Sequence, residues 1–386
     1  QPGALGGPGP QVWLAGPAAG RVMRSVRHLL ALILAVGGAL LAGAEVHTVS
    51  TPEALKAAVD GLQSGDEIRL AADIVPIEPL EIRYVQGVTI TSVAGVNYIL
   101  DGGNARTLMK IRNGADVDVS RIIFRNGLGS ALTPGALSIS SDARVRLNQV
   151  TFRSNRIPGQ AIEGGAVSIR GATVSMEGCD FLDNEVGDGT GGSALRVEDA
   201  AVNCTTCVFR GNTASNGYGG ALYVGSTDRS GGDPLKVVIR SSTFEENRLL
   251  SGVFGGGAVT IQAGYSQVES VALLGCSFRN NQGSEGAHDI KMASIVPDTL
   301  RIESDCAAGS FDGATSGELS CSDCPGGPHP AVFSGTCPAC NLYNPAAGSW
   351  SCTAARCSSV SAQQASFCSG LNRTSLVGNA GDVQCS

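Results

Sequence analysis

The 386-residue sequence is poor in aromatic and charged residues, which make up only 5% and 16% of the chain. Its net charge of −7 gives no general electrostatic reason to expect nucleic-acid binding. The hydrophobic share of 42% is too high for an intrinsically disordered chain. No apolar run after residue 44 is long enough to cross a bilayer. Glycine, in contrast, is abundant with 53 residues, and this balance favours small-residue turns and β structure over helices.

The first 44 residues have the features of a targeting segment. Residues 1–22 are rich in Gly, Pro and Ala and contain no Met, so we interpret them as a gene-model extension or a disordered stretch. From Met23, the basic Arg24 and Arg27 precede the apolar run LLALILAVGGALLAG and an Ala-Gly-Ala site at 42–44. This order predicts a signal peptide over 23–44, with a signal anchor as the alternative. We therefore expect a secreted or cell-surface protein that associates with membranes only through further sequence or a partner.

A short amphipathic helix is predicted at the start of the mature chain. Ser50 and Glu53 have the spacing of a capping box, and Pro52 suits the first turn of a helix. The apolar residues that follow have helical spacing: Leu55, Ala58, Val59 and Leu62. We expect this helix to cover the first open edge of the strands that come after it.

A repeat of 28 to 35 residues fills the centre of the chain. One column of the aligned copies is always phenylalanine: Phe124, Phe152, Phe181, Phe209, Phe244 and Phe278. Valine lies seven residues earlier in every copy. Three residues after the Phe, five of the six copies have asparagine: Asn155, Asn184, Asn212, Asn247 and Asn281. A second conserved stretch within each repeat reads Ala-apolar-x-apolar and usually follows a glycine pair, as in GGALYV at 219–224.

This repeat predicts an all-β fold, a right-handed parallel β-helix solenoid over residues 45–303. The apolar positions alternate, which is the pattern of strands. Parallel stacking of similar coils would place each Phe on the next at the strand spacing of about 4.8 Å. We expect each Asn to occupy a left-handed turn and to hydrogen-bond its counterparts along the stack. The glycine pair should allow a bend that a Cβ atom would block.

The combination of Phe-x-x-Asn with Gly-Gly-Ala-apolar, over roughly residues 110–295, resembles the repeat of the polymorphic outer membrane proteins. The resemblance implies a parallel β-helix. Members of that family are cell-surface proteins, and the bacterial ones are adhesins. The resemblance therefore also implies a role at the cell surface in adhesion or recognition.

Nine of the 13 cysteines lie in the last 81 residues. We assign residues 304–386 to a cysteine-rich module, and its cysteines have two interpretations. The spacing C-x₂-C-x₁₂-C-x₂-C from Cys321 to Cys340 is that of a tetrathiolate zinc site. In an oxidising compartment, the same density of cysteines indicates disulfides, and the signal peptide favours this interpretation. The number nine is odd, and the ending DVQCS suggests a truncated module.

This module resembles the ephrin-receptor-like cysteine-rich repeat. The matching positions are Cys306, Gly309, Cys321, Cys324, Pro325, Gly327, Cys337 and Cys340. The resemblance implies disulfides Cys306–Cys321 and Cys324–Cys337, followed by Cys340–Cys352.

The remaining cysteines, Cys179, Cys204, Cys207 and Cys276, fall on inward columns of the repeat and are interpreted as small buried apolar residues. Cys179 and Cys207 share a column in adjacent coils and could form a bridge, while a redox or metal role for Cys204-x-x-Cys207 is a remote alternative. Two sequons, at Asn203 and Asn372, are candidate glycosylation sites, and Asn203 is expected to face outward.

The outward column four residues before each Phe contains no paired carboxylates of the kind that glycoside hydrolysis requires. One basic column stands out immediately after the Phe, and it could contact an acidic glycan: Arg125, Arg153, Arg210 and Arg279. His288 in GAHDIKM is interpreted as a polar residue on the last coil rather than as a catalytic one.

Two functions are consistent with these features. The first is a secreted or cell-surface β-helix protein for adhesion, recognition or extracellular structure, with no catalytic, metal or cofactor residues assigned. Its expected partner is a glycan or a cell-surface protein. The alternative is a polysaccharide-active lyase or hydrolase of the parallel β-helix type, because that fold is used by such enzymes.

Overall fold

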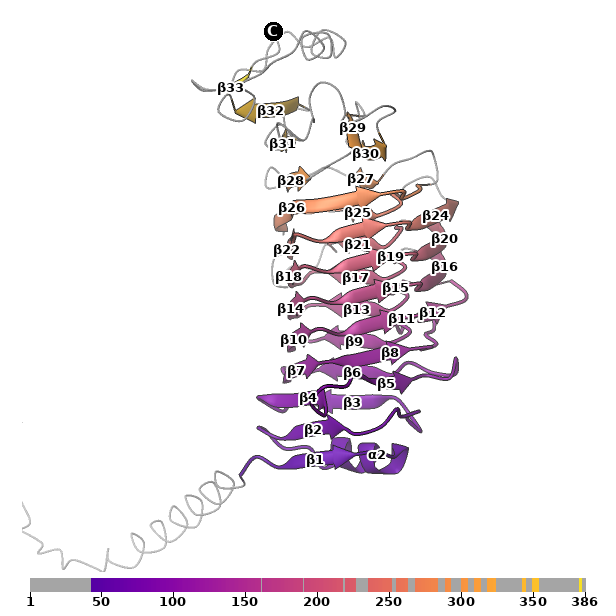
Figure 1. The fold of residues 1–386 in the computed structure, drawn as a ribbon, viewed down its shortest axis with the longest axis vertical. Helices are drawn as coiled ribbons and strands as arrows, with labels where there is room; N and C mark the ends of the chain where they lie inside the picture. The colour runs from indigo at the N-terminus through magenta and orange to yellow at the C-terminus, as the bar shows by residue number, and fades with distance from the viewer. Residues whose placement is uncertain are drawn as a thin grey trace, which may run out of the picture. The chain divides into compact units, whose positions relative to one another are not determined.

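The computed structural model describes residues 43–160, 162–189, 191–217, 219–226, 235–251, 255–262, 268–283 and 289–292, and short strands between 300 and 383. The chain divides into two compact units, residues 1–44 and residues 45–386. The second unit contains the repeat and is built almost wholly of strands stacked in parallel coils (Figure 1). The predicted fold class, a parallel β-helix solenoid, is confirmed.

Each coil contributes strands to flat faces that run along the stack, and we name these faces A to D. Face A comprises β1 (Val46–Val49), β2 (Glu67–Leu70), β4 (Val88–Ser92), β7 (Asp116–Ser120), β10 (Arg144–Asn148), β14 (Thr173–Glu177), β18 (Ala201–Thr205), β22 (Leu235–Arg240), the first part of β26 (Val268–Arg279) and β28 (Leu300–Ser304). Face B comprises β5 (Tyr98–Asp101), β8 (Ile122–Arg125), β11 (Thr151–Arg153), β15 (Asp180–Leu182), β19 (Val208–Arg210), β23 (Thr243–Glu245) and the end of β26.

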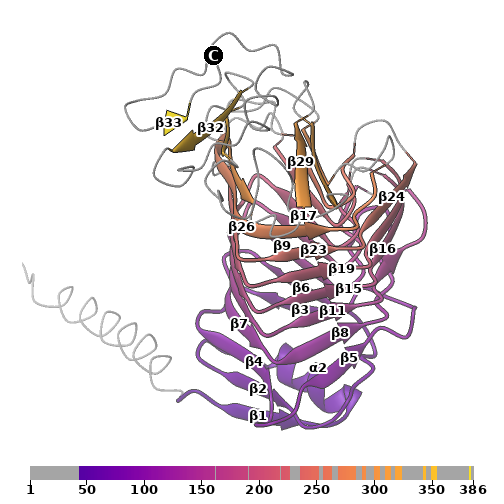
Figure 2. The same cartoon turned by 45° about the horizontal axis from the view of Figure 1, so that its top comes forward.

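The other two faces close each coil. Face C comprises the parallel strands β3 (Leu80–Arg83), β6 (Met109–Arg112), β9 (Leu137–Ser140), β13 (Val167–Arg170), β17 (Leu195–Glu198), β21 (Leu222–Gly225), β25 (Val259–Gln262) and β27 (Ile290–Met292), extended by the antiparallel β30 (Glu318–Asp323) and β29 (Gly309–Gly313). Face D comprises β12 (Arg156–Ile157), β16 (Glu185–Gly189), β20 (Thr213–Gly217) and β24 (Arg248–Ser251). Its strands project to one side of the stack (Figures 1 and 2). A separate sheet contains β31 (Leu342–Asn344), β32 (Ser349–Thr353) and β33 (Asp382–Val383).

The core consists of continuous ladders of like residues, as the repeat predicts. The six phenylalanines pair in register from coil to coil on face B, with Leu100 in the equivalent position one coil earlier. Successive rings are stacked with centroid distances of 5.2, 5.0, 4.7, 4.6 and 5.1 Å. Stacked aromatic pairs are favourable beyond their buried area, so this ladder stabilises the core in addition to its hydrophobic burial.

The repeated asparagines form a buried hydrogen-bonded ladder. Asn212 shows the pattern: its Nδ2 donates to Phe181 O at 2.9 Å and to Asn247 Oδ1 at 2.9 Å. Its Oδ1 in turn accepts from Asn184 N at 3.0 Å and from Asn184 Nδ2 at 2.9 Å. The ladder begins at the backbone N–H of Gly127 and ends where Asn281 Nδ2 donates to Asp289 Oδ1 at 2.7 Å. Every amide is therefore paired although it lies away from water.

The expectation that these asparagines occupy left-handed turns is wrong. The left-handed residues are the ones directly before them, such as Ser154 at φ 53° and Asp183 at φ 55°. A second left-handed turn precedes each Phe by three residues, as at Gln149 with φ 52°. The corner thus turns one residue earlier than predicted, and this directs each Asn side chain inward, where it bonds to the next coil.

The glycine pairs serve the close approach of neighbouring coils. A Cβ atom on Gly165 would lie 2.1 Å from Ser193 O, and one on Gly220 would lie 1.6 Å from Gly257 O. Neither glycine has a positive φ. A side chain at these positions would therefore separate the coils. The prediction that the corner excludes a Cβ atom is confirmed, and the reason is the close approach of the next coil, where a bend was expected.

The N-terminal coil carries the predicted helix, α2 (Pro52–Asp60), with Leu55, Ala58 and Val59 buried. Its N-cap is Thr51, whose Oγ1 accepts from Ala54 N at 3.2 Å, so the prediction of Ser50 as the cap is wrong by one residue. The reason is Pro52, because a proline restricts the preceding residue to extended backbone, as an N-cap requires.

The four cysteines of the repeat are buried, as predicted. The structure joins Cys204 to Cys207 in a disulfide, so the alternative of a Cys179–Cys207 bridge is wrong. Burial raises the pKa of the Cys179 thiol to about 11, and its Sγ lies 3.6 Å from Leu147 O. Cys179 is therefore a neutral core residue at physiological pH.

We predict that the asparagine ladder is a major source of stability. Asn212→Ala removes one amide and leaves buried donors and acceptors on both neighbouring coils without partners, at about 1–3 kcal/mol each. The free energy of unfolding, measured by urea titration, should fall by about 3 kcal/mol or more. Asn148→Ala on exposed face A is the matched control, with an expected change within about 0.5 kcal/mol. A similar small change in both variants would contradict the prediction.

The phenylalanine stack gives a second prediction, which depends on position. Phe181→Ala creates a cavity between two rings in the middle of the stack and should cost about 3–5 kcal/mol of unfolding free energy. Phe278→Ala should cost less, because Phe278 is 6% exposed and has a ring partner, Phe244, on one side. Thermal and urea unfolding of both variants would test this order, and equal losses would contradict it.

Candidate functional site

Face A presents short and long outward side chains in separate rows across neighbouring coils. On β10 the outward residues are Arg144, Arg146 and Asn148, which are exposed. On β14 and β18 the outward positions are shorter or neutral apart from Glu177: Thr173, Ser175, Ala201, Asn203 and Thr205. On β22 long cations return with Lys236 and Arg240. The strand register aligns all of these residues in columns.

A surface depression of about 440 Å³ lies on this part of face A. The charged residues described in its lining are cationic: Arg144, Arg146, Lys236 and Arg240. The floor between these cations is formed by the short side chains of β14 and β18, because a row of small residues between rows of long ones leaves a hollow. Among the residues that the structure describes, no carboxylate lines this depression, so the hollow favours an anionic or polar ligand.

The cations differ in how they are held by the rest of the protein. Arg146 Nη2 lies 3.0 Å from Asp116 Oδ1, and its Nε donates to Asp118. The hydrogen bond to Asp118 raises the pKa of Arg146 above its ordinary value, so Arg146 stays charged. Arg240 Nη1 donates to Asn203 Oδ1 at 3.0 Å. No described carboxylate forms an ion pair with Arg144, which leaves its guanidinium available to a ligand.

A second depression of about 610 Å³ adjoins the first and shares Arg146, Ser175 and Asn203 with it. Its lining includes the carboxylates of Asp118 and Glu177, together with Asn148 and Thr205. This neighbouring surface is therefore of mixed charge. Asn203 lies in the lining of both depressions and faces outward, as predicted. Glycosylation of Asn203 stays a prediction.

The predicted basic column lies on face B, away from these depressions. Its members align from coil to coil, with Leu182 and Glu245 at intervening positions. Arg125 and Arg153 both face carboxylates: Arg125 Nη2 lies 2.6 Å from Asp101 Oδ2, and Arg153 Nε lies 3.8 Å from Asp183 Oδ2. Ligand contact by Arg125, Arg153, Arg210 and Arg279 stays a prediction.

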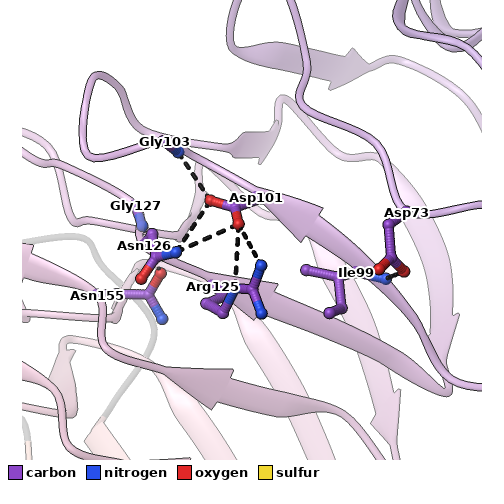
Figure 3. A network of polar contacts seen from close by, with 8 residues as sticks. All are labelled: Asp73, Ile99, Asp101, Gly103, Arg125, Asn126, Gly127 and Asn155. Atoms are coloured by element: carbon purple, nitrogen blue, oxygen red, sulfur yellow. Dashed lines mark hydrogen bonds and ion pairs between the residues drawn. The ribbon is translucent and has the colours of Figure 1, made fainter.

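Asp101 is the centre of a polar network at the start of this column (Figure 3). Its carboxylate accepts from Gly103 N at 2.9 Å, from Arg125 Nε at 3.0 Å and from Asn126 Nδ2 at 3.1 Å. Burial acts to raise the pKa of Asp101, but these hydrogen bonds outweigh it and hold the pKa below its ordinary value. The network therefore stabilises the first coils when Asp101 is ionised.

A buried polar network on the outer side of face C was not found from the sequence. Arg170 Nε donates to Glu198 Oε2 at 2.5 Å, and Arg170 Nη2 lies 3.5 Å from Glu163 Oε1. Ser168 donates to Glu163. The structure thus brings two carboxylates together around one guanidinium, on a face that does not include the column four residues before each Phe.

This network extends to a tyrosine on the next coil. Arg196 Nη2 donates to Glu198 Oε1 at 2.7 Å, and the Arg196 guanidinium lies 4.9 Å from the centroid of the Tyr223 ring. The Tyr223 hydroxyl donates to Gln262 Oε1 at 2.8 Å. Glu163 and Glu198 are only 7% and 5% exposed. Because both carboxylates are ion-paired and buried, the arrangement favours a structural role over acid–base chemistry.

A signal for this network exists in one column of the sequence repeat. The fourth residue after the Ala of each second strand reads Ser140, Arg170, Glu198, Gly225 and Gln262. Opposite charges at one repeat position in adjacent copies indicate an ion pair, since parallel stacking makes them neighbours. The face A cations could have been found in the same way by reading Arg144 and Lys236 as one column.

Several predicted residues lie outside the part of the chain that the structure describes. These are His288, Asn372 and the cysteines Cys306, Cys324, Cys337 and Cys340. Cys321 and Cys352 lie in β30 and β32, whose side chains are not described. Within the described ranges, no three His, Cys, Asp or Glu side chains are placed to hold a metal ion. A helix long and apolar enough to cross a bilayer is also absent from those ranges.

The Asp101 network gives a prediction for pH dependence. Because the folded-state pKa of Asp101 is lowered, its contribution to stability is present above the unfolded-state pKa of about 3.9 and is lost as pH falls through the folded-state pKa. The loss of unfolding free energy caused by Asp101→Asn should therefore be largest near neutral pH and shrink below about pH 4. Urea unfolding over this pH range measures it, with the exposed turn variant Asp142→Asn as control. A loss that is constant with pH would contradict the assignment.

No family model and no curated protein matches the sequence. Among solved structures, the chain is similar to the PL6 family alginate lyase AlyGC, with 13% sequence identity and a TM-score of 0.24. The match covers 72% of this chain and 55% of that enzyme, so the chain spans about half the length of the structure that it matches. At this TM-score the similarity carries no argument about the site.

Proposed function

We propose that this protein is a secreted or cell-surface recognition protein that binds an acidic glycan on face A of its parallel β-helix. The observation that carries the proposal is the depression in which the described charged residues are Arg144, Arg146, Lys236 and Arg240. Sugar hydroxyls need hydrogen-bonding partners as well as charge complementarity. The Thr, Ser and Asn side chains on the floor between the cations would supply them.

The cellular setting of the proposal comes from the sequence. The predicted signal peptide over 23–44 supports secretion. The repeat resembles that of the polymorphic outer membrane proteins, which supports a role in adhesion or recognition. The resemblance of residues 304–386 to an ephrin-receptor-like module, with disulfides among its cysteines, supports an extracellular location.

An enzymatic alternative is a lyase or hydrolase that acts on polysaccharides. The paired carboxylates Glu163 and Glu198 favour it over a purely passive scaffold, because glycoside hydrolysis uses two carboxyl groups. Their burial and their ion pairs with Arg170 and Arg196 oppose it. The recognition function therefore has the better support, since its side chains are exposed to a ligand.

Binding of polygalacturonate, a polymer with one carboxylate per sugar, tests the proposal. Arg144→Gln and Lys236→Gln should each weaken binding by about tenfold, the loss of roughly one charge-assisted hydrogen bond. Arg83→Gln, at an exposed position on face C, is the matched control and should bind like the wild type. Added salt should weaken binding, because exposed charges are screened.

The same titration distinguishes the two functions. A neutral β-1,4-glucan should not bind, and analysis of the polygalacturonate after incubation should show no shortening. Equal affinity of the wild type, Arg144→Gln and Lys236→Gln proteins would contradict the proposed site. Release of shorter fragments, abolished by Glu198→Gln, would establish the enzymatic alternative instead.

A further inference from the structure

Two of the face A cations lie in one column at a defined separation. The register pairs Arg144 with Thr173, Thr173 with Ala201, and Ala201 with Lys236. Arg144 and Lys236 are therefore three strand spacings apart, or about 14 Å along the stack at about 4.8 Å per strand. Both are exposed, and both line the same depression.

The surface between them is shaped to let a ligand pass from one cation to the other. Thr173 and Ala201 are much shorter than the cationic side chains on either side. The long side chains at the two ends of the column therefore extend further from the sheet than those in its middle. The neighbouring column of Ser175 and Asn203 offers polar atoms at the same two coils. A ligand that follows this column would be held by charge at both ends and by hydrogen bonds in between.

The two adjoining depressions indicate the direction of the ligand. Together they are lined by residues from β7, β10, β14, β18 and β22, which are five successive strands along the stack. Across the strands, the outward positions are only three per strand, as with Arg144, Arg146 and Asn148 on β10. The concave surface is therefore longer along the stack of coils than across it, about 19 Å against about 13 Å.

We propose that the face A site binds a linear anionic oligosaccharide along the stack of coils, with one sugar per coil and four sugars as the shortest chain that contacts both Arg144 and Lys236. This inference rests on the proposed function. A 1,4-linked pyranose unit is about as long as the spacing between strands, so the first and fourth sugars reach β10 and β22. Their carboxylates meet the two cations, and the middle sugars meet the neutral floor.

Affinity as a function of chain length tests this geometry. Oligogalacturonates of two to six sugars are titrated into the wild-type protein, Arg144→Gln, Lys236→Gln and the double variant, with Arg83→Gln as control. The dissociation constant should improve by about tenfold between three and four sugars and change little beyond, because the second charge-assisted contact forms at four. Each single variant should bind four sugars as weakly as the wild type binds three.

The shorter oligomers provide the sharpest contrast. A disaccharide can use either cation alone, so each single variant should retain its binding within about twofold, whereas the double variant should lose it. A smooth rise of affinity with length, or a disaccharide whose binding is lost when either Arg144 or Lys236 alone is replaced, would overturn the proposal. Polygalacturonate distinguishes failure of the proposed function from failure of this inference. If the polymer does not bind, the proposed function is wrong. If the polymer binds but the oligomers show no step in affinity at four sugars, only the proposed length and direction of the ligand are wrong.

Discussion

The buried asparagine ladder is the interaction on which the rest of the structure depends. Each amide bonds to the backbone of the preceding coil and to the amide of the next coil, as Asn212 does with Phe181 O and Asn247. A coil that slipped by one residue would leave these buried groups without partners and would turn its apolar side chains outward. The ladder therefore fixes the register that also stacks the phenylalanine rings and aligns the outward columns.

The strand register decides which outward side chains of different repeats become neighbours on the surface. Residues about 30 positions apart in the sequence become neighbours at the strand spacing. A substitution in one copy of the repeat therefore also changes the surroundings of the equivalent residues in the two adjacent coils. On face A this places the cations of β10 and β22 on either side of two coils with mostly short, neutral side chains. The repeat constrains the inward positions, and the outward positions are the ones that are able to vary with function.

Faces A and C show two outcomes of the same architecture. On face C, Arg170 and Glu198 pair across adjacent coils, and Arg196 adds a second cation to the same carboxylate. Opposite charges at neighbouring positions satisfy one another, and the network is buried. On face A the cations Arg144 and Lys236 lie in one column with the neutral Thr173 and Ala201 between them, and both side chains are exposed. This difference in charge arrangement, on equivalent backbones, is the reason why the proposed recognition site is placed on face A.

The sequence by itself determined the fold class, the repeat, the inward Val, Phe and Asn columns and the burial of Cys179, because alternation and periodicity are local properties of the chain. It misplaced the left-handed residue by one position and the helix N-cap by one residue, where neighbouring positions have similar chemistry. It missed the pairing of Glu163 and Glu198 around Arg170, since Glu163 lies on a connecting loop whose path depends on the coils beside it. Only the tertiary structure decided that Arg144 and Lys236 line one depression, because the space left above the short side chains of β14 and β18 depends on how the neighbouring coils stack.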